Sequence, residues 1–211
     1  MRDDRGFYVS AVWFLIIINV LLFVATLLQP VFFPTKYQRD ELFYRLALKP
    51  AYFTEEPWTI VTSIFVHDGF PHILFNMLAL YFFGTYLSAL IGDGKFLITY
   101  FLGGLLGGAF WILYGLYAPG ANPYIAVVGA SGAIFALGGA LAVLRPNAKV
   151  IVFPIPAPMS LWVAVIGIFL VMTFLSVWFP ISWQAHLGGL VLGLIAGLIF
   201  RSRQRPFIRR Y

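Results

Sequence analysis

The stretch that decides the fold lies at residues 96–144 and reads FLITYFLGGLLGGAFWILYGLYAPGANPYIAVVGASGAIFALGGALAVL. It contains no Asp, Glu, Lys or Arg, and neither does a second stretch at residues 150–200. Each stretch is long enough for two transmembrane helices of about 20 residues. Over the whole chain, 61% of residues are hydrophobic and 10% are charged, which is far from the composition of a soluble domain. The sequence therefore predicts an all-α membrane protein.

The rest of the composition excludes several kinds of site. Cysteine is absent, which rules out disulfides, thiolate metal sites and a cysteine nucleophile. A net charge of +6 could favour nucleic acid, but the charges lie at the ends of the apolar segments, so membrane topology explains them better. We therefore expect the lipid bilayer as the surroundings, and no nucleic-acid partner, metal or cofactor.

Six apolar segments follow one another in a single predicted domain at residues 1–211. The predicted transmembrane helices lie at about residues 9–28, 72–91, 96–117, 131–144, 159–178 and 184–200. The first segment could be the core of a signal peptide, but it is long enough to span and a poor cleavage site follows it, so we interpret it as a helix. Residues 30–71 form a long loop with short interfacial helices.

The distribution of basic residues predicts the orientation in the membrane. Six spans place both termini on one side. The N-terminus, residues 92–95, residues 145–158 and the C-terminal tail together carry ten of the fourteen Lys and Arg residues. The positive-inside rule places this side in the cytoplasm and the loop at residues 30–71 on the outside.

Helix lengths predict that Ser131 and His186 lie at the same depth. A helix over residues 131–144 covers only about 21 Å of a hydrocarbon core that is about 30 Å thick. If Arg145 lies at the inner surface, Ser131 lies roughly 9 Å below the outer surface. His186 precedes Arg201 by 15 residues, so it lies roughly 8 Å below the outer surface.

This pair has the residue types of a nucleophile and its base. A serine hydroxyl becomes nucleophilic when a neighbouring base takes its proton, and histidine is the usual base at neutral pH. No Asp or Glu occurs after Asp93, so a Ser131–His186 dyad is expected and not a triad. We expect Phe135, one turn after Ser131, to pack against the imidazole.

Two further polar residues are predicted near the same level. His72 and Asn76 are four positions apart and share one helix face in the outer part of the bilayer. Polar side chains are costly in hydrocarbon, which makes these two functional candidates. Together with the backbone N–H of Ser131, they could stabilise the oxyanion of an attacked carbonyl.

Glycines are expected to bring the serine and histidine helices together. Gly189 and Gly193 repeat every four residues on the last helix, and Gly132 begins a facing stripe of small residues. Such stripes let helix backbones come close. The chain at residues 119–129 must descend into the membrane without being helical, which requires surrounding protein or water. Gly129 lets this descending chain turn into the helix.

Four elements of the sequence, taken in order, resemble the rhomboid family of intramembrane serine proteases. They are Trp58 in the long first loop, His72-Ile-Leu-Phe-Asn76, Gly129-Ala130-Ser131-Gly132, and Ala185-His186 followed by Gly189 and Gly193. The resemblance spans most of the chain and implies a rhomboid-like bundle of six transmembrane helices.

The resemblance also implies roles. Such proteins cut single-pass transmembrane substrates near or within the bilayer. Ser131 would be the nucleophile and His186 the general base. His72, Asn76 and the Ser131 backbone N–H would stabilise the oxyanion. This implies a serine endopeptidase with transmembrane proteins as its partners.

Substrate entry is a further implication of the resemblance. Substrate would enter laterally between the helices at residues 72–91 and 159–178, with residues 179–183 acting as a cap. One position departs from the family: Thr59 follows Trp58 where arginine is common. This departure concerns how the first loop is anchored.

Other readings stay open. A non-catalytic membrane scaffold that binds client helices would fit the same bundle. A transporter would usually show repeated halves or charged relays, and neither is visible.

His67 and Asp68 are interpreted as polar contacts of the loop. The elbow of soluble hydrolases does not fit, because Ala133 stands where it needs glycine. We expect a bacterial or archaeal plasma membrane, and the sequence leaves the oligomeric state open.

Overall fold

The computed structural model describes residues 10–32, 41–152 and 154–204. The predicted helix start at residue 9, part of the loop at residues 30–71, and the tail from residue 205 lie outside them. The helices are α1 (Ala11–Phe32), α2 (Glu41–Leu46), η1 (Pro50–Tyr52), α3 (Thr59–Thr62), η2 (Ser63–Phe65), α4 (Phe70–Ile91), α5 (Asp93–Tyr117), α6 (Ser131–Leu144), α7 (Leu161–Leu175) and α8 (Trp183–Gln204). Two short strands, β1 (Lys149–Val150) and β2 (Met159–Ser160), pair antiparallel.

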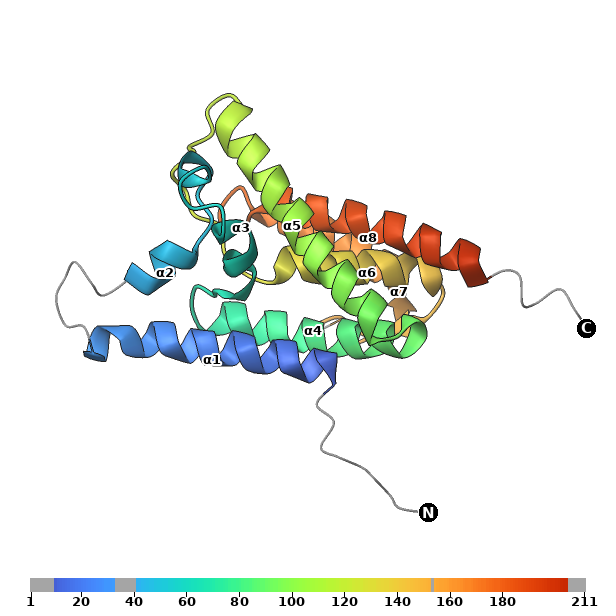
Figure 1. Cartoon of the computed structure of the whole chain (residues 1–211). Coiled ribbons are helices and arrows are strands. Elements are labelled where there is room, and N and C mark those ends of the chain that lie inside the picture. Colours follow the sequence, from blue (N-terminus) through green and yellow to red (C-terminus); the bar gives the residue numbers. More distant parts are fainter. Residues whose placement is uncertain (1–9, 33–40, 153, 205–211) are drawn as a thin grey trace, which may run out of the picture.

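The long helices run between two ends of the molecule, and α6 lies in their middle (Figure 1). α6 packs against α4, α5, α7 and α8, while α1 packs on α4. One end, on the right in Figure 1, holds the start of α1, the α4–α5 turn and the end of α8. The opposite end holds α2, α3 and the start of α6. The first residue of α6 therefore lies beneath the elements of the first loop.

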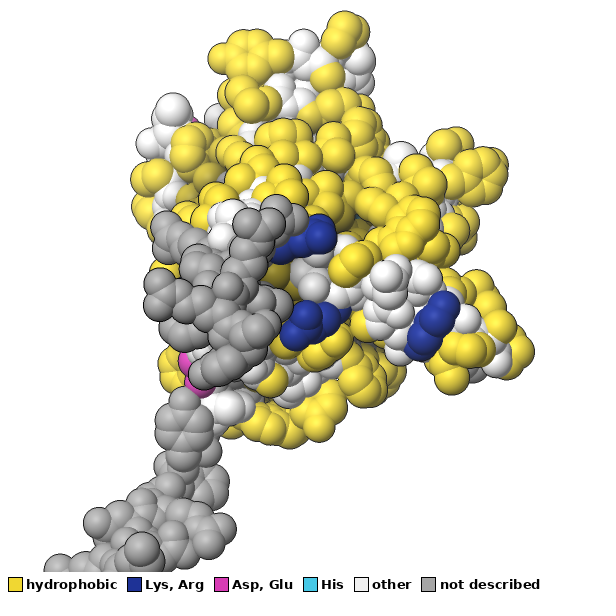
Figure 2. Space-filling view, turned by 90° about the vertical axis from the view of Figure 1, so that its right-hand side faces the viewer, with side chains coloured by type: hydrophobic (Ala, Val, Ile, Leu, Met, Phe, Trp, Pro, Cys, Tyr) yellow, Lys and Arg dark blue, Asp and Glu magenta, His cyan; other side chains and the backbone are white. Residues whose placement is uncertain are grey.

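Four of the described helices, α1, α4, α5 and α8, are long and apolar enough to cross a membrane. α6 and α7 are also apolar but have only 14 and 15 residues. The chain is a mostly helical, multi-pass membrane protein, and the count of six spans stays a prediction. Figure 2 views the end that holds the C-terminus of α8, where apolar side chains surround several Lys and Arg side chains.

Two boundaries differ from the sequence-based expectation. The helix expected over residues 159–178 is shorter, because its first two residues form β2 and because the chain turns after Leu175. There the hydroxyl of Ser176 donates to the carbonyl of Thr173 at 2.6 Å, and the chain continues in hydrogen-bonded turns as far as Phe179. The turn expected at residues 92–95 is a single residue, Gly92, whose φ of 84° no other residue adopts as readily.

α6 and α8 contact each other backbone to backbone. A Cβ atom on Gly189 would collide with the carbonyl oxygen of Gly132, and one on Gly193 would collide with the carbonyl oxygen of Ala136. α5 approaches α8 in the same way, since a Cβ on Gly107 would lie 2.7 Å from the Ala185 carbonyl oxygen. Small residues thus set the spacing of the three central helices.

The chain between α5 and α6 is not helical, and the first loop supports it. Val127 pairs with Leu48 in an isolated antiparallel bridge. The N–H of Gly129 donates to the carbonyl of Ser63 at 2.9 Å. These bonds satisfy backbone groups that would otherwise be costly at membrane depth. They also place the start of α6 directly under the first loop.

Candidate active site

Ser131 is the first residue of α6, and His186 lies in the first turn of α8. Ser131 Oγ and His186 Nε2 are 2.8 Å apart, although the residues are separated by 55 positions in the chain. This separation is that of a hydrogen bond and suits proton transfer between the two atoms. The structure thus brings together the two residues that helix lengths place at one depth.

The His186 imidazole is held against an aromatic ring. Its centroid lies 4.7 Å from that of Phe135, with 32° between the ring planes. The ring of Phe169, on α7, meets the ring of Phe135 edge-on, with 6.0 Å between the centroids. His186 Nδ1 is buried, and among the described residues it has no hydrogen-bond partner. Within that part of the chain, the serine–histidine pair has no carboxylate as a third member.

His72 and Asn76 lie on the first turns of α4 and face Gly129. The side-chain amide of Asn76 donates to the His72 carbonyl at 3.0 Å. A Cβ on Gly129 would lie 2.6 Å from His72 Nε2 and 3.7 Å from Asn76 Nδ2. Gly129 also has a φ of 112°. Both predicted polar side chains therefore face the residue that precedes Ser131 by two positions in the chain.

The turn before α4 makes contacts that sequence reasoning interpreted only as loop contacts. The backbone N–H of Asp68 donates to His72 Nδ1 at 3.3 Å. The ring of His67 meets the ring of His72 edge-on, with centroids 5.0 Å apart. Nothing in the spacing of the sequence pairs His67 with His72, because the turn that joins them is formed only in the fold.

A cavity of about 20 Å³ lies beside Ser131, between α5, α8 and the first loop. Ser63, Gly104, Val128 and Ala185 are among the residues that line it. This volume holds about one water molecule. Sequence reasoning missed Ser63, which also accepts the bond from Gly129. Among the described residues, no three His, Asp or Glu side chains are grouped to hold a metal ion.

The rhomboid domain family matches residues 54–203, which is more than half of the 211-residue chain. The chain belongs to the rhomboid family. The match includes the serine, both histidines of the site and the asparagine.

Curated relatives of this rhomboid carry different names. Rhomboid protein 1, mitochondrial, of Saccharomyces cerevisiae is 33% identical over 162 residues, which cover 70% of this chain and 44% of that protein. Rhomboid protease GluP of Bacillus subtilis is 33% identical over 145 residues, covering 67% of this chain and 25% of that protein. Inactive RHOMBOID-like protein 8 of Arabidopsis thaliana is 33% identical over 79 residues, which cover 37% of this chain and 22% of that protein. The chain thus spans less than half the length of each relative.

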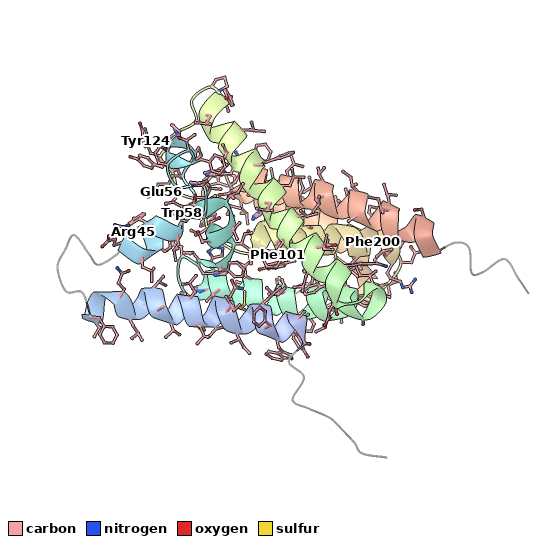
Figure 3. All side chains as sticks on the ribbon, in the orientation of Figure 1. Arg45, Glu56, Trp58, Phe101, Tyr124 and Phe200 are labelled. Carbon is pink, nitrogen blue, oxygen red and sulfur yellow. The ribbon has the colours of Figure 1, made fainter. Side chains whose placement is uncertain are left out.

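The first loop of this rhomboid is anchored without the arginine that is common in the family. Trp58 Nε1 donates to the backbone carbonyl of Arg45 at 3.1 Å, so α2 and α3 lie side by side (Figure 3). Thr62 Oγ1 donates to the Leu46 carbonyl at 2.8 Å. Thr59 itself is buried and donates within the loop, to the Glu56 carbonyl at 2.6 Å.

Proposed function

We propose that this rhomboid is an intramembrane serine endopeptidase that cuts transmembrane proteins near or within the bilayer. The observation that carries the proposal is the 2.8 Å contact between Ser131 Oγ and His186 Nε2. Family membership alone would not carry it, because one relative is named inactive. The proposal therefore rests on these two residues and on the groups around them.

In the proposed reaction, His186 Nε2 takes the hydroxyl proton while Ser131 Oγ forms a bond to the substrate carbonyl carbon. The imidazolium then gives this proton to the amide nitrogen as the C–N bond breaks, which leaves an acyl-enzyme. A water molecule, deprotonated by the same imidazole, then attacks the ester carbon. The bond from this carbon to Ser131 Oγ breaks, the imidazolium returns the proton to Oγ, and the new carboxyl end of the substrate is released. Stacking on Phe135 supports this role, because it holds the imidazole in one orientation.

The oxyanion formed in both attacks needs donors that are already in place. We assign this role to His72 Nε2, the Asn76 side-chain amide and the Ser131 backbone N–H. The first two face Gly129, and the third begins α6 and has no acceptor within its own helix. The positive end of the α6 dipole favours negative charge at the same place.

The packing of α4 and α7 supports the substrate entry between them that the family resemblance implies. α8 contacts α6 through backbone atoms, whereas α4 and α7 reach α6 at Gly138 through the side chains of Phe83 and Val165. Helices that meet through side chains separate at lower cost. We propose that a single-pass transmembrane segment enters here, under the connection at residues 179–183. A bacterial or archaeal plasma membrane stays a prediction, since one relative is named mitochondrial.

Reconstitution in liposomes with a model single-pass substrate tests the proposal. We expect cleavage by the wild-type protein and covalent labelling of Ser131 by a fluorophosphonate, read by mass spectrometry of the labelled peptide. Ser131→Ala should abolish both, and His186→Ala should lower the rate at least about a thousandfold. Cleavage retained in Ser131→Ala would refute the mechanism.

The same experiment separates an enzyme from a scaffold. A non-catalytic scaffold would bind the substrate helix without cleaving it, and the probe would not label Ser131. Gly167→Ala on α7 serves as the control variant, because no atom lies within 4 Å of the added methyl group.

A further inference from the structure

His67 is a buried histidine with no evident structural task. Its side chain is 2% exposed, and among the described residues neither ring nitrogen has a hydrogen-bond partner of normal geometry. The backbone of Phe65 interacts with the ring and opposes the lowering of its pKa, but this contact lacks normal hydrogen-bond geometry. Unpaired buried polar atoms destabilise a fold, so a histidine at this position requires another explanation.

The ring that His67 contacts belongs to the proposed oxyanion site. The two imidazoles meet edge-on, with 5.0 Å between centroids and 65° between planes. The next residue, Asp68, donates its backbone N–H to His72 Nδ1 at 3.3 Å. Gly69, with a φ of 88°, turns the chain into α4. One short turn therefore touches the His72 ring at two points.

These contacts determine which nitrogen of His72 can donate. Nδ1 accepts the N–H of Asp68, so it carries no proton, and a neutral imidazole then carries its proton on Nε2. Nε2 is the atom that faces Gly129, where a Cβ would lie 2.6 Å away. The donor N–H of His72 is therefore directed at the backbone just before Ser131.

We propose that His67 is a positioning residue for His72. Its ring contact holds the His72 imidazole in the orientation in which Nε2–H faces the carbonyl attacked by Ser131. This inference rests on the proposed function, because it gives a task to a neighbour of the proposed oxyanion donor.

His67 acts by contact and not by charge. Burial, together with the charge of a protonated His72, lowers the pKa of His67 to about 3. The ring is therefore neutral at physiological pH. The other ionisable group of the turn is the carboxylate of Asp68. It is exposed, and its charge interacts with His72 and not with His67.

Two substitutions at His67 separate ring contact from polarity. His67→Phe keeps the ring edge and removes the unpaired nitrogens, so we expect a cleavage rate within about threefold of wild type. His67→Ala removes the contact and should lower kcat about tenfold with KM unchanged, because a misplaced donor weakens the transition state and not the substrate complex. Equal losses in both variants, or no loss in His67→Ala, would overturn the proposal.

A double-substitution experiment excludes a merely structural role. In a His72→Ala background, His67→Ala should have no further effect on kcat, because the ring that it positions is gone. A tenfold loss that persists in this background would overturn the proposal. Thr59→Val is the matched control, since Thr59 is buried in the same loop and its hydroxyl donates to the Glu56 carbonyl and not to His72. The kcat of Thr59→Val should equal that of wild type.

A measurement without activity separates this proposal from the proposed function. Nitrogen-15 spectra of histidine side chains, assigned with His72→Ala, should show the His72 proton on Nε2 in the wild type and in His67→Phe. In His67→Ala the His72 signals should shift or broaden, because the ring is no longer held against the N–H of Asp68. An unchanged His72 spectrum in His67→Ala refutes positioning, whereas failure of Ser131-dependent cleavage refutes only the proposed function.

Discussion

Gly129 shows how much a single position can constrain this site. Its φ of 112° lies in the region that favours glycine, and its Cα faces His72 Nε2 and Asn76 Nδ2. Either condition alone disfavours a side chain. Gly129 therefore has two roles. It turns the chain toward α6, and its backbone lines the space where an oxyanion would form.

We predict that Gly129→Ala abolishes most of the proposed protease activity and destabilises the protein by about 1–2 kcal/mol, because the methyl group strains the backbone and displaces His72. Cleavage rate and thermal unfolding in detergent measure the two effects. Gly120→Ala is the control, because Gly120 also has a positive φ, 77°, but has no atom within 4 Å of an added Cβ. Gly120→Ala should lose stability and keep activity; equal activity of both variants would contradict the assigned contact.

At the scale of elements, the α6–α8 interface sets the distance between the serine and the histidine. Both catalytic candidates lie in the first turns of their helices, and the glycines that follow remove any side chain between the two backbones. A change several turns away from the site is therefore transmitted as a shift of a whole helix, since packed helices move as units.

Gly193→Ala tests this link. The added methyl group would collide with the Ala136 carbonyl oxygen, so we expect α8 to move away from α6 at a cost of about 1–3 kcal/mol. Activity should fall at least tenfold although Gly193 lies two turns beyond His186, and fluorophosphonate labelling of Ser131 should slow in parallel. Gly167→Ala, on the open face of α7, should keep full activity and gain about 0.5–1 kcal/mol. Normal activity in Gly193→Ala would show that the interface tolerates separation.

At the scale of the whole molecule, charge and depth give the bundle two different ends. The end with the start of α6 carries α2, α3 and the exposed acids Glu41 and Glu55. The opposite end, which holds the start of α5 and the ends of α6 and α8, carries exposed Lys95, Arg145 and Arg201. Figure 2 shows Lys and Arg side chains at this end. The positive-inside rule predicts that the second end lies in the cytoplasm and that the serine lies nearer the outer surface.

The absence of cysteine from the chain makes this orientation testable. Thr54→Cys lies in the first loop and Asn147→Cys in the turn after α6, and both positions are exposed. We expect a membrane-impermeant maleimide to label Thr54→Cys on intact cells and Asn147→Cys only after permeabilisation. The reverse pattern would place the site on the cytoplasmic side.

Particular residues show what sequence reasoning could and could not reach. Apolar run lengths predict α1, α4, α5, α6 and α8 within a few residues, because the hydrocarbon core penalises any unpaired backbone. The end of α7 is expected three residues too late, because Val177 and Trp178 in the turns after Leu175 are as apolar as the helix itself. His67 was interpreted as a loop contact because its partner ring comes from the next element.

The sequence by itself determined that the chain is a helical membrane protein, which helices carry the serine and the histidine, and that small residues let those helices approach. These are properties of composition, length and spacing, to which the bilayer responds directly. Only the tertiary structure decided the 2.8 Å contact of Ser131 with His186, the position of Gly129 against His72, and the ring of His67 beside them. Those distances depend on how separate elements pack and turn, and packing is set by all of the side chains at once.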